Sequence, residues 1–185
     1  MSETQAKPKP MSDAHFKGMV FLYRLTSLIW NPERHLRKVP VEKGMVVVDY
    51  GCGPGRYTVP LSKLVGPEGK VFAVDIQPLA TKMVKQKSAQ ESLTNIEPIL
   101  IDSYDTGIPG STADLVLLVD TLHEIGDCDA LFWEIHRILK PHGILFMDPG
   151  HMRLSKAREI VESTGLFTIL ECRNRDMLVT PKGKR

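Results

Sequence analysis

The chain has 185 residues, of which 42% are hydrophobic and 25% charged, and these values are typical of a globular protein with a sizeable core. Its formal net charge of +2 is too small to argue for nucleic acid as a partner. No apolar run has the length of a membrane span, and the polar N-terminus lacks the apolar core of a signal peptide. We therefore expect a cytoplasmic protein without a membrane span.

The N-terminal region divides into a tail and a helical segment. Residues 1–11 are short, polar and proline-bearing, which predicts a disordered tail. Residues 12–39 favour helices, because apolar residues recur there at steps of three and four: Phe16, Met19, Val20, Tyr23 and, as a further candidate, Leu22. A second short helix is predicted to open at Asn31-Pro32, with Asn31 as its N-cap. These helices can pack on an edge of the fold or close over a cofactor as a lid, and we favour packing as their main role.

Strand and helix patterns alternate over the rest of the chain. The predicted strands are Met45–Asp49, Lys70–Asp75, Ile96–Ile101, Asp114–Asp120 and Ile144–Met147. The predicted helices are Tyr57–Val65, Pro78 to about Ser92, one capped by Asp127 that ends at Lys140-Pro141-His142-Gly143, and one capped by Ser155 that Gly165 terminates. The segments Phe167–Cys172 and Met177–Thr180 predict a closing antiparallel hairpin.

This alternation implies parallel strands joined by right-handed crossovers. The predicted fold class is therefore α/β, a three-layer α/β/α Rossmann-like sandwich with a mostly parallel seven-stranded sheet and a C-terminal antiparallel hairpin. We expect residues 12–185 to form a single domain, with the N-terminal helices at 12–39 and the α/β core at 40–185.

A glycine-rich turn follows the first predicted strand, in the segment Asp49-Tyr50-Gly51-Cys52-Gly53-Pro54-Gly55-Arg56. The glycines let the backbone turn sharply and approach a ligand closely, and the next helix would direct its free N–H groups to that ligand. Asp75 comes 26 residues after Asp49, where a nucleoside-binding α/β domain places the acid that accepts from a ribose. Because Arg56 occupies the place of the third glycine in a dinucleotide fingerprint, the turn favours a ligand with one nucleoside and no pyrophosphate.

Acidic residues end all five predicted strands of the alternating region: Asp49, Asp75, Asp102, Asp120 and Asp148. Ligands of open α/β sheets bind beyond the carboxyl ends of the strands. Aspartate is common where strands end, which would explain one or two of these residues, but five together favour a ligand site. Cys52 suits the crowded turn because it is small, and we do not expect a reactive thiol there.

The motifs together resemble those of class I S-adenosylmethionine-dependent methyltransferases. The matching segments, in chain order, are Asp49–Gly55, Phe72–Ile76, Asp102-Ser103, Asp114–His123 and Leu139–Leu145. The resemblance covers residues 40–180 and implies S-adenosyl-L-methionine as cofactor. It also implies roles by position: Gly51, Cys52 and Gly53 approach the methionine part, Asp75 holds the ribose, Ile76 packs on the adenine, Asp102 and Ser103 bind the adenine, Asp120 lies near the methionine end, and Asp49 orders the turn.

A catalytic base is optional in such an enzyme, because the sulfonium already makes the methyl group electrophilic. His123 and Glu124 follow the fourth strand and His151 follows the fifth, and His123 is our candidate base. The alternative is a histidine that only lines or packs against the cofactor cleft. His123, Asp148 and His151 could form a metal site, but their separation in the sequence matches no known pattern of metal ligands. The three cysteines, Cys52, Cys128 and Cys172, lack the sequence spacing of zinc ligands, so no metal is expected.

The methyl acceptor is expected to be a small or lipid-like molecule. The chain reads Asp120-Thr121-Leu122-His123 after the fourth strand, which lacks the signature of enzymes that methylate planar amino groups of nucleic acids or glutamine, and no insertion for a substrate domain follows the fifth. We expect no nucleic acid partner and a monomer or homodimer. The alternative is a cofactor-binding, non-catalytic partner or regulatory subunit with the same fold. A nicotinamide-dependent oxidoreductase is disfavoured by Arg56 and by the lack of a Tyr-x-x-x-Lys motif.

Overall fold

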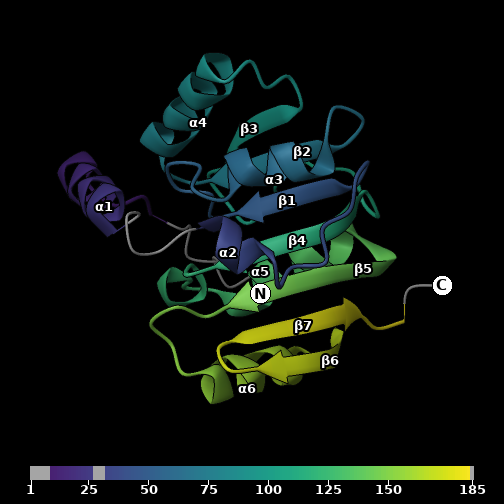
Figure 1. The fold of residues 1–185 in the computed structure, drawn as a ribbon. Coiled ribbons are helices and arrows are strands. Elements are labelled where there is room, and N and C mark those ends of the chain that lie inside the picture. Colours follow the sequence, from purple (N-terminus) through teal and green to yellow (C-terminus); the bar gives the residue numbers. More distant parts are fainter. Residues whose placement is uncertain (1–8, 27–31, 184–185) are drawn as a thin grey trace. The chain divides into compact units, whose positions relative to one another are not determined.

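The structure is a computed structural model that describes residues 9–26 and 32–183 (Figure 1). The predicted tail, up to residue 8, and the predicted N-cap Asn31 lie outside the described residues. Residues 9–100 form one compact unit and residues 101–183 belong to a second, and the two are described in turn.

The unit of residues 9–100 is built on three parallel strands. Its elements are α1 (Asp13–Thr26), α2 (Pro32–Leu36), β1 (Val46–Tyr50), α3 (Thr58–Val65), β2 (Lys70–Asp75), α4 (Pro78–Gln90) and β3 (Ile96–Leu100). β2 pairs with β1 and with β3, so that Val46 lies opposite Lys70 and Val71 opposite Ile96. The middle of β2 is fully buried, as expected for a parallel strand covered on both faces.

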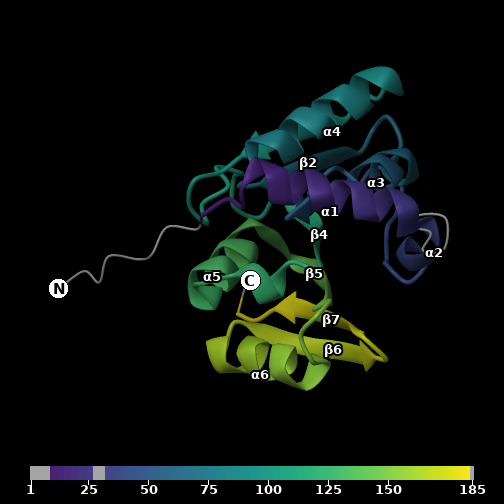
Figure 2. The same ribbon diagram turned by 90° about the vertical axis from the view of Figure 1, so that its left-hand side faces the viewer.

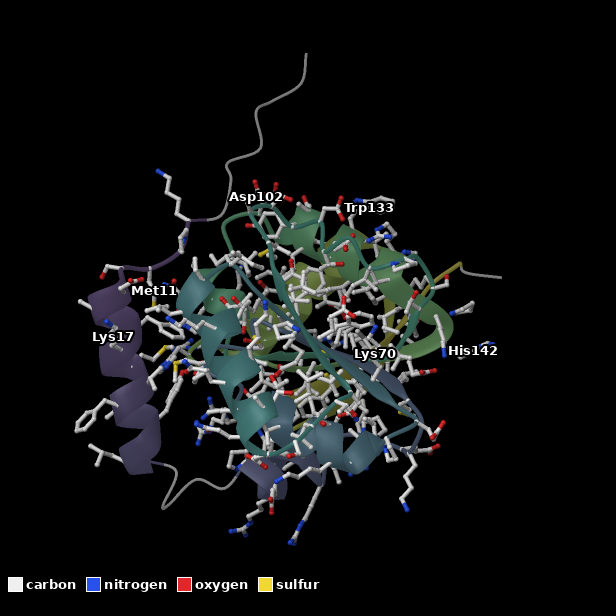
Figure 3. All side chains as sticks on the ribbon, turned by 90° about the horizontal axis from the view of Figure 1, so that it is seen from above. Met11, Lys17, Lys70, Asp102, Trp133 and His142 are labelled. Atoms are coloured by element: carbon white, nitrogen blue, oxygen red, sulfur yellow. The ribbon has the colours of Figure 1, made fainter. Side chains whose placement is uncertain are left out.

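Helix α1 packs along the start of α4 (Figure 3). Phe16 and Val20 of α1 are buried against Ala80, and Met11, Met19, Leu79 and Met83 surround them. This contact confirms Phe16, Met19 and Val20 on the predicted apolar face, whereas Leu22 is 58% exposed and was wrongly placed on it. Tyr23 is half-buried, and its ring lies under the Arg56 guanidinium, 5.3 Å from its centroid. A hydrogen bond adds to the contact with α4, because the side-chain amide of Gln77 donates from Nε2 to the backbone carbonyl of Met11 over 2.7 Å. The structure thus shows α1 packed against α4, which is the role favoured from the sequence.

The unit of residues 101–183 combines two parallel strands with a hairpin. Its elements are β4 (Ala113–Val119), the short 3₁₀ helix η1 (Leu122–Glu124), α5 (Cys128–Ile138), β5 (Leu139–Asp148), α6 (Leu154–Thr164), β6 (Phe167–Arg173) and β7 (Asp176–Pro181). β4 and β5 are parallel, whereas β7 runs antiparallel to both β5 and β6. Figure 2 shows α6 lying beside the β6–β7 hairpin.

Two predicted helix boundaries in this unit are confirmed and two are wrong. The Asp127 carboxylate accepts from the amide of Ala130 over 2.9 Å and caps α5, and Gly165 ends α6 with a left-handed φ of 68°. Helix α6, however, begins at Leu154 after Arg153, so Ser155 lies inside the helix rather than at its cap. The stretch 140–143 is part of β5 and not a loop, because β5 starts at Leu139, which pairs with Ala113 of β4.

The seven strands of the described residues, five in parallel pairings and two in the C-terminal antiparallel hairpin, confirm the predicted fold class. Among the helices of the described residues, none is long and apolar enough to cross a membrane.

Candidate functional site

The glycine turn after β1 has the backbone that its sequence predicts. Gly51, Gly53 and Gly55 have φ values of 76°, 50° and 78°, a region that residues with a side chain rarely adopt. The amides of Gly51 and Cys52 both donate to the carbonyl of Val74, at 2.8 and 3.0 Å, which fixes the turn against β2. A side chain at Gly53 would meet no atom within 4 Å, so the backbone there faces open space.

Asp75, at the end of β2, is held by the same turn. One carboxylate oxygen accepts from the amide of Gly53 over 2.7 Å, and the other accepts from the amide of Gln77 over 2.8 Å. Each carboxylate oxygen has a second lone pair, so the group can still accept from a ligand. This half-buried carboxylate beside open backbone fits the ribose of S-adenosylmethionine, and Ile76 follows it as a half-buried apolar residue.

Asp49 is buried beneath the turn. Its carboxylate is 3% exposed and accepts from the hydroxyl of Thr58, the first residue of α3, over 2.6 Å. Burial raises the pKa of Asp49 to about 7, the Thr58 hydrogen bond opposes the rise, and the negative charge of Asp75 adds to it. The contact that the structure gives Asp49 therefore ties β1 to α3, and its direct part in cofactor binding stays a prediction.

Cys52 is also buried, and its surroundings make it unreactive. Burial raises the pKa of its thiol well above the usual value, and the negative charges of Asp49 and Asp75 raise it further. Since the thiolate is the nucleophilic form, the thiol of Cys52 stays inert near neutral pH.

Two residues that sequence reasoning missed also fix this turn. Lys87 of α4 donates to the carbonyl of Pro54 over 2.6 Å, and Thr58 bonds to Asp49. Thr58 could have been suspected from its place at the start of a helix beside the glycines. Lys87 has no local signal, because its partner lies 33 residues away in the sequence.

In the unit of residues 101–183, Asp120 ends β4 with an uncommon backbone. Its φ is 54°, and its amide donates to the carbonyl of Asp148 over 2.8 Å. One oxygen of its carboxylate is buried and has no hydrogen-bond partner among the described residues. A buried acceptor without a partner is costly, and the ammonium group on the methionine part of the cofactor is a donor that would satisfy it. This unpartnered acceptor supports the predicted place of Asp120 near the methionine part, which stays a prediction.

Two histidines gather around Asp120. His123 Nδ1 lies 3.7 Å and His151 Nε2 lies 3.9 Å from the same buried oxygen of Asp120. The two imidazole rings meet edge to face with centroids 5.1 Å apart. His123 Nε2 lies 3.8 Å from a carboxylate oxygen of Glu124.

Asp102 and Ser103 lie in the bend that follows β3. Asp102 is exposed and Ser103 is half-buried, and their roles toward the adenine stay predictions.

Comparison with known proteins decides the family, since residues 41–178 match the methyltransferase domain. The chain belongs to this methyltransferase family. Its fold is that of class I S-adenosylmethionine-dependent methyltransferases, and S-adenosylmethionine is the cofactor that this membership implies.

Relatives and solved structures agree with the family. Two demethylmenaquinone methyltransferases are similar to the chain, from Geobacillus stearothermophilus (32% identity over 59% of the chain and 47% of the relative) and Geobacillus kaustophilus (30% over 71% and 56%). The chain therefore spans about half the length of these curated relatives.

The crystal structure of a SAM-dependent methyltransferase from Aquifex aeolicus matches with a TM-score of 0.81 and 23% identity over 93% of this chain and all of that one. A TehB-like SAM-dependent methyltransferase from Corynebacterium glutamicum matches with a TM-score of 0.70 and 18% identity over 91% and 97%. At these identities the two structures support the fold.

Proposed function

We propose that this methyltransferase transfers the methyl group of S-adenosylmethionine to a small, lipid-like acceptor, with a quinone-like ring as the first choice. The observation that carries the cofactor part is the Asp75 carboxylate, held between the amides of Gly53 and Gln77 beside open backbone. The acceptor class is supported by the relatives named demethylmenaquinone methyltransferases. A cytoplasmic location belongs to the same proposal.

Different residues of the chain would bind the cofactor, support the glycine turn and accept a proton. S-adenosylmethionine, when bound, supplies an electrophilic methyl group. Asp75 would accept hydrogen bonds from the ribose hydroxyls, and Asp120 would accept from the ammonium of the methionine part. Asp49 and Thr58 would keep the glycine turn in place without touching the reacting atoms.

His123 would act as the general base that a hydroxyl or carbon acceptor requires. A proton taken up by its imidazole would create a positive charge within 4 Å of carboxylate oxygens of both Asp120 and Glu124. These two carboxylates would compensate that charge during the transfer. An acceptor that has already lost its proton would make His123 dispensable.

Calorimetric titration with S-adenosylmethionine tests the cofactor part. Asp75→Asn should weaken binding by about 10- to 100-fold, the value of a hydrogen bond to a charged group, whereas Glu68→Gln, which removes an exposed carboxylate from a turn of the same unit, should bind like wild type. Equal binding by wild type and Asp75→Asn would contradict the assigned role of Asp75.

Release of S-adenosylhomocysteine in the presence of demethylated quinones tests the acceptor part. Turnover with a ring acceptor and a lower kcat in His123→Gln would support the proposal. Tight cofactor binding with no turnover across quinone, phenol and amine acceptors would favour the non-catalytic partner subunit instead.

A further inference from the structure

Helix α1 is apolar on two opposite faces. Its inner face, with Phe16, Met19 and Val20, is packed against α4. Its outer face presents Phe21, Leu22 and Leu25, which are 64%, 58% and 53% exposed. Figure 3 shows α1 at the edge of the described part of the unit of residues 9–100.

The outer apolar stripe of α1 is continuous along the helix. Residues three and four apart share one face of a helix, so Ala14 and Gly18 extend the surface of Phe21, Leu22 and Leu25 toward the start of α1. No charged residue lies within this stripe, and the exposed Lys17 follows its edge. A helix with apolar residues on both faces is usually covered on both sides, and three large exposed apolar side chains on two turns indicate a binding surface.

The charge of the chain is unevenly distributed, and the sequence segment that contains this stripe is net positive. Residues 9–44 contain seven lysines and arginines but three aspartates and glutamates, a net charge of +4. The whole chain has 24 basic and 22 acidic residues, so the remainder has 17 and 19 and is net negative. Lys9, Lys17, Arg34 and Arg37 are exposed within the positive segment.

We propose that α1 docks by its outer stripe on the surface of an anionic lipid bilayer. An amphipathic helix with apolar residues on one side and basic residues around it lies in the plane of the interface, where apolar burial and attraction to acidic headgroups act together. The 14 residues of α1 span about 21 Å, which suits a helix lying on the bilayer rather than crossing it. A two-fold pairing of copies through the same stripe would place two net-positive segments against each other, which is unfavourable.

This docking does not depend on the proposed function, because binding to vesicles needs neither the cofactor nor an acceptor. Docking of α1 would also place the proposed methyl transfer at the membrane surface, where the enzyme would bind a lipid-like acceptor. Failure of docking would leave the cofactor site intact, and failure of methyl transfer would leave docking intact.

Co-sedimentation of the full chain with vesicles tests the docking. We expect binding to vesicles of phosphatidylglycerol and phosphatidylcholine, at least about tenfold weaker binding to phosphatidylcholine alone, and weaker binding as salt is raised. The variant Phe21→Ser/Leu22→Ser/Leu25→Ser should lose at least about tenfold in affinity, since each apolar side chain contributes to partition.

The matched control is Leu64→Ser/Leu170→Ser, which removes exposed apolar side chains from α3 and β6 and should bind like wild type. Circular dichroism and S-adenosylmethionine binding verify that each variant is folded. Equal vesicle binding by the triple variant and wild type would overturn the proposal. So would a dimer in light scattering that the triple variant converts to a monomer without any vesicle binding by wild type.

Discussion

The buried carboxylate of Asp49 should make the protein less stable as the pH rises through neutrality. Its pKa is raised from 3.8 to about 7 in the folded state, chiefly by burial. Between these two values the folded chain binds more protons than the unfolded chain. The stability that this protonation contributes is fully present below about pH 3.8 and is lost as the pH rises through about 7.

The size of this effect follows from the two pKa values. Between pH 5 and pH 8 the contribution of Asp49 to the free energy of unfolding should fall by about 2–3 kcal/mol. Asp49→Asn removes the titration and keeps an oxygen that can accept from the Thr58 hydroxyl. The variant should therefore gain about 2–3 kcal/mol in unfolding free energy relative to wild type on going from pH 5 to pH 8.

Guanidinium unfolding of both proteins at pH 5 and pH 8 measures this gain, and the comparison cancels the titration of the six histidines. Glu68→Gln, which removes an exposed carboxylate, should parallel wild type at both pH values. If the difference between Asp49→Asn and wild type is the same at pH 5 and pH 8, the reasoning from burial is refuted.

Two glycine substitutions test the geometry of the loops. Gly55→Ala should cost about 1–3 kcal/mol in unfolding free energy, because φ is 78° and the new Cβ would lie 3.0 Å from Val84. Gly44→Ala is the control and should cost less, because its φ is similar, 81°, but no neighbour lies within 4 Å. An equal cost for the two variants would show that contact with Val84 does not contribute. Gly150→Ala should cost more than about 3 kcal/mol, because its Cβ would overlap the Asp120 carboxylate. Adding Asp120→Gly should recover part of that loss in chemical unfolding, whereas simple addition of the two costs would contradict a direct clash.

The sequence predicted those features that depend on neighbours along the chain. The strand Lys70–Asp75 has its predicted bounds, Asp127 caps α5, and Gly165 ends α6 in the left-handed region, since each depends on local hydrogen bonds or on the backbone freedom of one residue. The glycine turn was likewise recognisable because its three glycines all adopt positive φ.

The errors concern partners that are distant in the sequence. Leu139 lies in a strand rather than at a helix end because it pairs with Ala113, 26 residues away, and no local pattern indicates that pairing. Lys87 reaches Pro54 over 33 residues. The helical spacing of α1 identified its inner face, but it could not decide whether Leu22 belongs to that face, because apolar residues occur on both.

The close approach of Gly150 to Asp120 also constrains how this protein can diverge. A side chain at position 150 would overlap the Asp120 carboxylate and lie 2.8 Å from the Asp120 Cα, so the segment after β5 cannot gain one unless the residue at 120 becomes smaller and the backbone there shifts. The two positions should therefore vary together among descendants of this chain. Changes in acceptor specificity would then occur at residues outside this contact. A loop taken from a relative and inserted after β5 should be tolerated only together with that relative's residue at the end of β4.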